Sequence, residues 1–393
     1  MNFTRILKLS FWKTLAIIFI SLGVIAAIER FSLGLGATTH LRDNFPWGIW
    51  IGFDILVGVG LAAGGFTIAA TVYLFNIERF RAILRPTVLT AFLGYVLVIC
   101  GLMADLGRPW AIWHAMIMWN PHSVMFEVAW CVMLYTTVLA LEFSPVVFER
   151  FKLERPAKIV HAITIPLVVL GVVLSTLHQS SLGSLFLIIP GRMHPLWYSN
   201  IIPFLFFISC VAAGLSMTIF ESFLSSRAFG REIELPLLTE LSRVLVVVLA
   251  LFFTVRLQDL ISRDALQYVF QPTYQSAMFL GEILIGVVLP FALLLFKKVR
   301  TSQKGLFYSA ALVILGFVAN RMNTAITSME RWNQRTYLPS LQELFITIGL
   351  ATAGFVAFYY IARYFPVFAP HHEQSVSTVN EPEFMDELRL VSK

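Results

Sequence analysis

The sequence is poor in charged residues, and this scarcity excludes a soluble globular protein. Only 13% of the 393 residues are Asp, Glu, Lys or Arg, whereas soluble domains carry about 25%. Hydrophobic residues make up 58% of the chain, and the mean hydropathy is +0.78. Because one membrane-spanning helix needs about 20 apolar residues, we expect a polytopic membrane protein. The net charge of +6 is therefore not a nucleic-acid signal.

Metal-ligand patterns are also scarce. The cysteines Cys100, Cys131 and Cys210 are isolated in apolar segments, so the chain cannot hold an iron–sulfur cluster alone. We interpret them as buried thiols that pack as small hydrophobic side chains. Of the eight histidines, only His161 and His178 fall within predicted spans, both on the fifth. A haem held by histidines on two facing helices is therefore not expected, and no metal site is predicted.

The apolar residues form ten runs, each long enough to cross about 30 Å of hydrocarbon as a helix. Backbone groups inside lipid must be satisfied within their own segment, which predicts an all-α fold with about ten transmembrane helices. The runs cover residues 12–34, 49–75, 87–107, 122–146, 159–182, 199–224, 241–262, 275–297, 305–328 and 340–365. A signal peptide is a possible alternative for the first run, but nine further runs favour a retained helix.

The chain divides into a short basic leader (1–11), a ten-helix domain (12–365) and a polar, flexible tail (366–393). Twenty of the 29 Lys and Arg residues lie at the two ends and in the even-numbered loops. Basic residues accumulate in cytoplasmic loops, so the sequence predicts that both termini are cytoplasmic.

Ionisable residues inside the spans concentrate near the predicted outer face. Asp54 and Glu127 each lie about five residues, or roughly 7 Å, into a span. An isolated carboxylate at such a position costs about 2.5–3.5 kcal/mol, so it needs a partner, a proton or a wet cavity. With Arg108 and His178, which close the third and fifth spans, they predict a polar pocket shared by spans two to five (45–197).

Other polar residues favour structural interpretations. Arg256 and Asp259 have the i, i+3 spacing of a helical ion pair, and we expect a structural role for them and for Glu282. Two GxxxG pairs in the second span favour close helix packing over room for a ligand. Most tryptophans near the outer interface fit an aromatic belt, although Trp47 is a candidate wall for an aromatic head group.

The fourth and fifth spans carry the proton and ligand candidates. Ser123 and Glu127 are four residues apart and share one helix face. A membrane-embedded glutamate can bind and release protons, so Glu127 is the proton-relay candidate. His178 and Gln179 lie in a dense run of hydrogen-bonding residues where the fifth helix leaves the lipid, which makes them candidates for ligand contact.

These motifs together resemble the NrfD/polysulfide-reductase membrane-subunit family, and within it the HybB-type integral membrane subunits of nickel–iron hydrogenases. The resemblance covers roughly residues 15–365. It rests on Phe45-Pro46-Trp47-Gly48-x-Trp50-x-x-x-Asp54, Ala63-Gly64-Gly65, Asp105-x-Gly107-Arg108-Pro109-Trp110, Asn120-x-x-Ser123-x-x-Phe126-Glu127, His178-Gln179-Ser180-Ser181-x-Gly183-Ser184 and His194-Pro195-Leu196-Trp197.

The resemblance implies a haem-free, quinone-binding subunit in the bacterial cytoplasmic (inner) membrane. Its implied partners are a periplasmic iron–sulfur subunit and the hydrogenase small and large subunits, and its substrate is menaquinone or ubiquinone. The predicted quinone-binding residues are Trp47, Asp54, Arg108, Ser123, His178 and Gln179, with Glu127 as the proton relay. Secondary candidates are His194, Asp105, Arg256 and Glu282.

Three alternatives are open at this point. The first is a membrane subunit of another iron–sulfur or molybdenum oxidoreductase of the same family. The second is a secondary transporter, which would carry polar groups at the bilayer midplane and be revealed by solute uptake into vesicles. The third is an inert anchor. Proton translocation through the inner half is a weaker hypothesis prompted by Glu142, His161 and Glu221, for which a solvated or capping role is expected.

Overall fold

The fold is described by a computed structural model that covers residues 10–43, 45, 47–333 and 336–368. The predicted leader and tail therefore fall almost wholly outside the described residues. Within those ranges the regular structure is helical, apart from one isolated β-bridge between Arg42 and Phe45. The all-α prediction is confirmed for the described chain.

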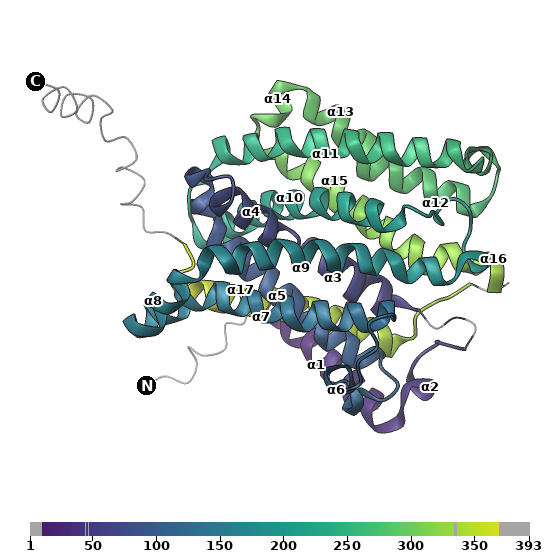
Figure 1. The fold of residues 1–393 in the computed structure, drawn as a ribbon, viewed down its shortest axis with the longest axis horizontal. Coiled ribbons are helices and arrows are strands. Elements are labelled where there is room, and N and C mark those ends of the chain that lie inside the picture. Colours follow the sequence, from purple (N-terminus) through teal and green to yellow (C-terminus); the bar gives the residue numbers. More distant parts are fainter. Residues whose placement is uncertain (1–9, 44, 46, 334–335, 369–393) are drawn as a thin grey trace, which may run out of the picture.

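Ten helical segments in the described residues are long and apolar enough to cross a membrane, as predicted. They run side by side along the long axis of the molecule (Figure 1). Their bounds are Phe11–Leu33, Trp50–Tyr73, Glu78–Asp105, Val124–Phe151, Thr164–Ile188, Ile202–Phe229, Leu235–Ser262, Tyr274–Leu295, Gln303–Glu330 and Leu341–Tyr364.

Five of these spans are single α-helices, and two others combine an α-helix with one 3₁₀ turn. The single helices are α1 (Phe11–Leu33), α7 (Val124–Phe151), α10 (Ile202–Phe229), α11 (Leu235–Ser262) and α17 (Leu341–Tyr364). The third span is η3 (Glu78–Phe80) with α5 (Arg81–Asp105), and the fifth is α9 (Thr164–Ser184) with η5 (Leu185–Ile188).

The remaining three spans contain π-helical segments. They are η2 (Trp50–Val57), α3 (Gly58–Leu61) and α4 (Gly64–Tyr73) in the second span, α12 (Tyr274–Ile283), η8 (Leu284–Val288) and α13 (Leu289–Leu295) in the eighth, and α15 (Gln303–Met322), η9 (Asn323–Thr327) and α16 (Ser328–Asn333) in the ninth. A π-helix is rare, and those that do occur are frequently found at functional sites. The residues in these three segments are therefore candidates for function. Asp54 lies within η2.

Two predicted boundaries differ from the structure near proline. The third run was expected to begin at 87, directly after Pro86, but Pro86 lies inside α5. The fourth run was expected to end at 146, one residue past Pro145, but α7 continues to Phe151. Neighbouring helices and local adjustments make proline tolerable in a membrane helix. His161 is a correction of another kind. It lies in the short exposed helix α8 (Glu154–Ala162), which ends before the fifth span begins.

An even number of spans places the start of α1 and the end of α17 at the same end of the bundle, on the left in Figure 1. We call this the terminal end and the opposite one the distal end. The loops that carry Trp47, Arg108 and His194 lie at the distal end.

Helices distant in sequence pack closely around the second span. Gly64 of α4 meets Gly214 of α10 backbone to backbone, because a Cβ atom on Gly214 would lie 2.4 Å from the Gly64 nitrogen. The α1 and α17 helices cross in the same way at Gly23 and Gly349. The α1–α17 pair also contacts α5, so the last span lies beside the second and third. The GxxxG prediction of close packing is confirmed at Gly64.

Candidate functional site

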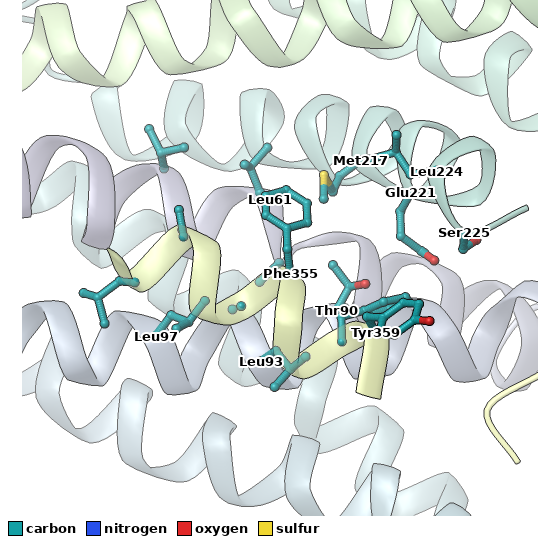
Figure 2. A pocket seen from close by; sticks show the side chains of 18 of the residues that line it. Leu61, Thr90, Leu93, Leu97, Met217, Glu221, Leu224, Ser225, Phe355 and Tyr359 are labelled. Atoms are coloured by element: carbon teal, nitrogen blue, oxygen red, sulfur yellow. The ribbon is translucent and has the colours of Figure 1, made fainter. Parts of the chain in front are cut away.

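A long crevice lies between the second, third, sixth and tenth spans. It has a volume of about 460 Å³, which is within the roughly 300–1,000 Å³ of typical ligand sites. Its walls come from η2, α3, α5, α10 and α17. Figure 2 shows Leu61, Leu93, Leu97 and Phe355 among the side chains that surround it. The predicted pocket of spans two to five therefore does not coincide with this crevice, because α10 and α17 replace α7 and α9.

The crevice walls are mainly apolar and open to the surface of the bundle. Leu224 and Phe355, which line it, are 38% and 62% exposed, so the crevice reaches the lipid-facing surface between α10 and α17. Near the terminal end, the rings of Phe229 and Tyr359 stack 5.5 Å apart. The polar lining residues are Asp54, Thr90, Glu221, Ser225 and Tyr359. Such a shape suits a hydrophobic ligand that enters from the bilayer.

Asp54 lines the crevice toward its distal end. The Thr347 hydroxyl on α17 donates a hydrogen bond of 2.7 Å to Asp54 Oδ2. Gly101 on α5 lies directly against the aspartate, since a Cβ there would be 2.7 Å from Asp54 Cβ. The carboxyl group is thus held between three spans and is half-buried. Asp54 is a predicted site residue that the structure places in a cavity.

Further polar groups gather beside Asp54 at the distal end. Buried Arg30 of α1 donates from Nε to Ala104 O and from Nη2 to Leu106 O, both at 2.8 Å. These bonds satisfy carbonyl groups at the C-terminal end of α5, which otherwise lack helical partners. Within the described residues, Asp105 Oδ1 and Trp50 Nε1 are buried without a hydrogen-bond partner. Asp105, a secondary candidate, belongs to this group, whereas Arg30, Trp50 and Thr347 were not predicted.

The start of α17 is fixed at the distal end by a buried tyrosine. The Tyr337 hydroxyl donates to Glu343 and accepts a 3.1 Å hydrogen bond from the Ile49 nitrogen. Burial raises the pKa of Tyr337 well above its usual value, and the Glu343 carboxylate adds to the shift. The neutral hydroxyl therefore links the beginning of the second span to the beginning of the tenth. This link holds two walls of the crevice in register.

His178 and Gln179 lie outside the crevice, in a packed hydrogen-bonded group. The fully buried His178 shares a 2.9 Å hydrogen bond between Nδ1 and the Tyr95 hydroxyl. Gln179 Nε2 donates to Val59 O at 3.1 Å, and the Cys210 thiol donates to Gln179 Oε1 at 2.6 Å. Cys210 thus has a polar role that the small-hydrophobe interpretation did not include.

The fourth-span residues form separate contacts. Glu127 is exposed, and its Oε1 accepts a 2.6 Å hydrogen bond from the Ser181 hydroxyl on α9. Ser123 caps the start of α7 by accepting from the Phe126 nitrogen at 3.4 Å. Ser123 and Glu127 thus both lie at the start of α7, where oxygen acceptors and negative charge are favourable.

Arg108 and Trp47 belong neither to the His178–Gln179 group nor to the contacts of Glu127 and Ser123. The Arg108 residue is exposed in the loop after α5. The Trp47 ring packs edge-on against Phe186 with the ring centroids 5.2 Å apart. Of the six predicted quinone-binding residues, Asp54 is therefore the one found in the crevice lining.

A third polar group joins the loop after the fifth span to the eighth and ninth spans. The Glu282 carboxyl is 3% exposed and accepts hydrogen bonds from Trp197 Nε1 at 3.2 Å, Asn320 Nδ2 at 3.0 Å and Asn323 Nδ2 at 2.7 Å. A buried carboxyl that is satisfied in this way is a structural cross-link. The predicted structural role of Glu282 is consistent with this geometry.

Asp259 has several cationic and hydroxyl partners. Arg256 lies 3.5 Å from Asp259, Arg263 lies 2.6 Å from it, and the Ser199 hydroxyl donates to it at 2.6 Å. The predicted Arg256–Asp259 ion pair is confirmed. His194 lies in the adjoining loop, with its ring 5.8 Å from that of Trp197, and its Nδ1 accepts from the Leu196 nitrogen at 3.2 Å.

Two other predictions need correction. Cys100 is exposed on α5 rather than buried, while Cys131 and Cys210 are buried. Glu221 was expected to be solvated or to cap a helix, but it is 6% exposed and lines the crevice. Its position near the end of a hydrophobic run did not reveal that α4 and α5 would pack beside it.

The histidines do not fit a haem held by two imidazoles. In the described ranges, His178 is the histidine buried within a span; its Nδ1 bonds to Tyr95 and its Nε2 has no hydrogen-bond partner, but no second buried histidine in a span faces it. His40, His122 and His161 are exposed, and His194 lies in a loop. Across the same ranges, no group of three or more His, Cys, Asp or Glu residues could hold a metal ion.

Comparison with known proteins places the chain among membrane subunits of oxidoreductases. Residues 37–330 match the family model described as "Polysulphide reductase, NrfD". The chain is 34% identical, over 87% of its length and 88% of the relative's, to the probable Ni/Fe-hydrogenase 2 b-type cytochrome subunit of Escherichia coli. It is 29% identical to the menaquinone reductase integral membrane subunit of Nitratidesulfovibrio vulgaris, over 93% of both chains. It is 22% identical to the Hdr-like menaquinol oxidoreductase integral membrane subunit of Archaeoglobus fulgidus, over 71% and 69% of the two lengths.

Proposed function

Because the chain belongs to the polysulphide reductase NrfD family, a family that supplies integral membrane subunits, we propose that it is the quinone-binding subunit of a respiratory oxidoreductase. In this proposal, the chain passes electrons between a periplasmic iron–sulfur subunit and menaquinone or ubiquinone in the bilayer. A nickel–iron hydrogenase is the proposed enzyme, supported by the name of the relative at 34% identity.

The crevice with Asp54 in its wall is the single observation that carries this proposal. A quinone combines a flat ring with a long apolar chain, and the crevice combines apolar walls with a carboxyl group held by Thr347. Quinone supplies the redox chemistry, whereas the protein supplies binding, orientation and protons. The ring is proposed to lie against Asp54, and the chain of the quinone to lie along the apolar walls or to leave toward the lipid between α10 and α17.

Asp54 is proposed to exchange a proton with the quinone oxygen. Reduction of a quinone to a quinol takes up two electrons and two protons. The carboxyl group can hold and release a proton, and the Thr347 hydroxyl fixes the orientation of one of its oxygens. Water is kept from the ring by the apolar walls, which strengthens each polar contact inside the crevice.

The distal end is proposed to face the periplasm and the electron donor. The basic residues favour the terminal end as the cytoplasmic side. Glu127 lies exposed at the distal end and, through Ser181, contacts the helix that carries His178 and Gln179. We propose this pair as a proton relay between the periplasm and the interior. Arg108, exposed in the same region, is a candidate for contact with the partner subunit or an anionic group.

The chain is proposed to function without haem, although one relative is named as a b-type cytochrome. We expect the purified subunit to show no haem Soret band and to contain far less than one haem per chain by the pyridine haemochrome assay. The physical reason is that His178 lacks a second imidazole on a facing helix in the described chain. A stoichiometric haem that His178→Ala removes would contradict this part of the proposal.

Filling the crevice tests the proposed function. In the intact complex, Ala351→Trp places a bulky ring in the α17 wall of the crevice. It should slow donor-to-quinone electron transfer several-fold, while reduction of a soluble dye by the donor enzyme is unchanged. Tyr360→Trp is the matched control, because Tyr360 does not line the crevice and its side chain is 48% exposed. Unchanged quinone reduction in Ala351→Trp would contradict binding in the crevice.

A further inference from the structure

We propose that the terminal half of the crevice is a second binding position for the ring of a quinone or quinol, held by Glu221, Thr90 and Ser225. This inference rests on the proposed function, because it takes a quinone as the ligand of the crevice. It adds a site on α10 and α5 that is separate from Asp54.

The unpaired carboxyl oxygen of Glu221 indicates a binding position for a ligand. Glu221 is 6% exposed and lines the crevice, yet its Oε1 has no hydrogen-bond partner among the described residues. Thr90 Oγ1, also buried and unpartnered in the described chain, lines the same space. Figure 2 shows the Glu221 carboxyl directed from α10 toward the side where Thr90 and Tyr359 lie. Buried polar groups are normally satisfied, so these two atoms require a partner that the fold does not provide.

Other groups on α10 and α17 complete a polar position. Ser225, one helical turn beyond Glu221, lies beside its carboxyl group. Tyr359 on α17 lines the crevice and stacks against Phe229. The apolar side chains of Met217 and Leu224 flank Glu221 on the same helix. A ring placed here would meet hydrogen-bonding groups at its edge and apolar groups on its faces.

This position and Asp54 are too far apart for one ring to contact both. Asp54 lies against Gly101 of α5, whereas Glu221 lies near Thr90, which is also on α5. Gly101 and Thr90 are eleven residues apart, which corresponds to about 16 Å along an α-helix. The crevice therefore has two polar positions joined by an apolar passage.

The charges of the crevice favour a neutral ligand. No Lys, Arg or His residue occurs among the described residues that line it. A phospholipid phosphate would be expected to attract such residues, whereas the carbonyl or hydroxyl of a quinone or quinol suits a carboxyl group and two hydroxyls. Leu224, beside Glu221, is partly exposed at the lipid-facing surface. The second position therefore lies next to an opening to the bilayer and serves quinone entry and exchange.

Photolabelling of the intact complex tests this position. The complex is reconstituted in phosphatidylcholine vesicles, labelled with an azido-substituted quinone, and analysed by peptide mass spectrometry. We expect label both in residues 217–228 of α10 and in residues 53–61 near Asp54, and excess unlabelled quinone should suppress both. Glu221→Leu with Thr90→Val should reduce the α10 label about tenfold, which is equivalent to the loss of one or two hydrogen bonds, and should retain the label near Asp54.

The control variant is Glu142→Gln. Glu142 lies in a membrane span but does not line the crevice. Co-purification of each variant chain with the donor enzyme confirms that the variants assemble, and dye reduction confirms that the donor enzyme is active. Label confined to residues 53–61, or α10 label that Glu221→Leu with Thr90→Val does not reduce, overturns the second position but not the proposed function. Label on α10 that excess unlabelled quinone does not suppress also overturns it. Absence of label from both segments would contradict both proposals.

Discussion

Asp54→Asn should reduce electron transfer from the donor enzyme to quinone by about a hundredfold or more, the range typical of a lost acid–base group. Asparagine has the same size as aspartate and keeps an oxygen that can accept the hydrogen bond from Thr347. It cannot hold or release the proton that the quinone needs. Packing against Gly101 should be unchanged, so the complex should assemble normally.

The measurement compares quinone reduction with dye reduction in the same membranes, because the dye takes electrons from the enzyme before they reach this chain. Thr347→Val should give a smaller loss than Asp54→Asn, since it frees the carboxyl group without removing it. Asp264→Asn is the matched control, because Asp264 is exposed in a loop and has a left-handed backbone that asparagine also tolerates. Full quinone activity in Asp54→Asn would remove the proton role from Asp54.

Glu127→Gln should also abolish most electron transfer to quinone and spare dye reduction. The substitution keeps an oxygen that can accept from Ser181 but removes the exchangeable proton. An acid–base group on a proton route is worth about a hundredfold or more. We expect a loss of at least about tenfold, measured as quinone reduction per assembled complex.

The structure allows Glu127 to be separated from a simple helix-capping role. Glu154→Gln is the matched control, because Glu154 is likewise an exposed glutamate in the first turn of a helix, α8. Ser181→Ala should give an intermediate loss, since it breaks the contact between α9 and the carboxyl group. Parallel losses of quinone and dye reduction in Glu127→Gln would indicate a structural role and contradict the relay.

The ten spans could be predicted because their signal is local. Each is a run of apolar residues of sufficient length, and this property does not depend on which helices become neighbours. The errors occurred where proline and polar residues lie inside helices, as at Pro86 and Pro145. A proline in a membrane helix can be compensated by tertiary contacts that a local pattern does not contain.

The crevice could not be predicted because its walls are distant in sequence. Asp54 was identified as a carboxyl group in need of a partner, but that partner, Thr347, lies 293 residues away in the tenth span. Thr347 is a single polar residue in an apolar helix and carries no distinctive pattern of its own. The sequence motifs of spans two to five drew attention to α7 and α9, whereas the fold places α5 and α17 around Asp54.

Glu221 is a second residue whose surroundings could not be predicted from the sequence. A carboxyl group near the end of a hydrophobic run is usually solvated, and this interpretation depended on nothing covering α10. The α4 and α5 helices pack beside it, and the group is buried. The π-helical segment around Asp54 was equally invisible, because a pattern of apolar residues does not separate π-helix from α-helix.

The position of a quinone bound to the intact complex in lipid nanodiscs, determined by electron cryo-microscopy, would show directly whether the ring binds in the crevice. We expect ring density between η2, α5 and α17, with a quinone oxygen within hydrogen-bonding distance of Asp54. Ring density between α7 and α9, beside Glu127 and His178, with the crevice filled by lipid, would contradict quinone binding at Asp54.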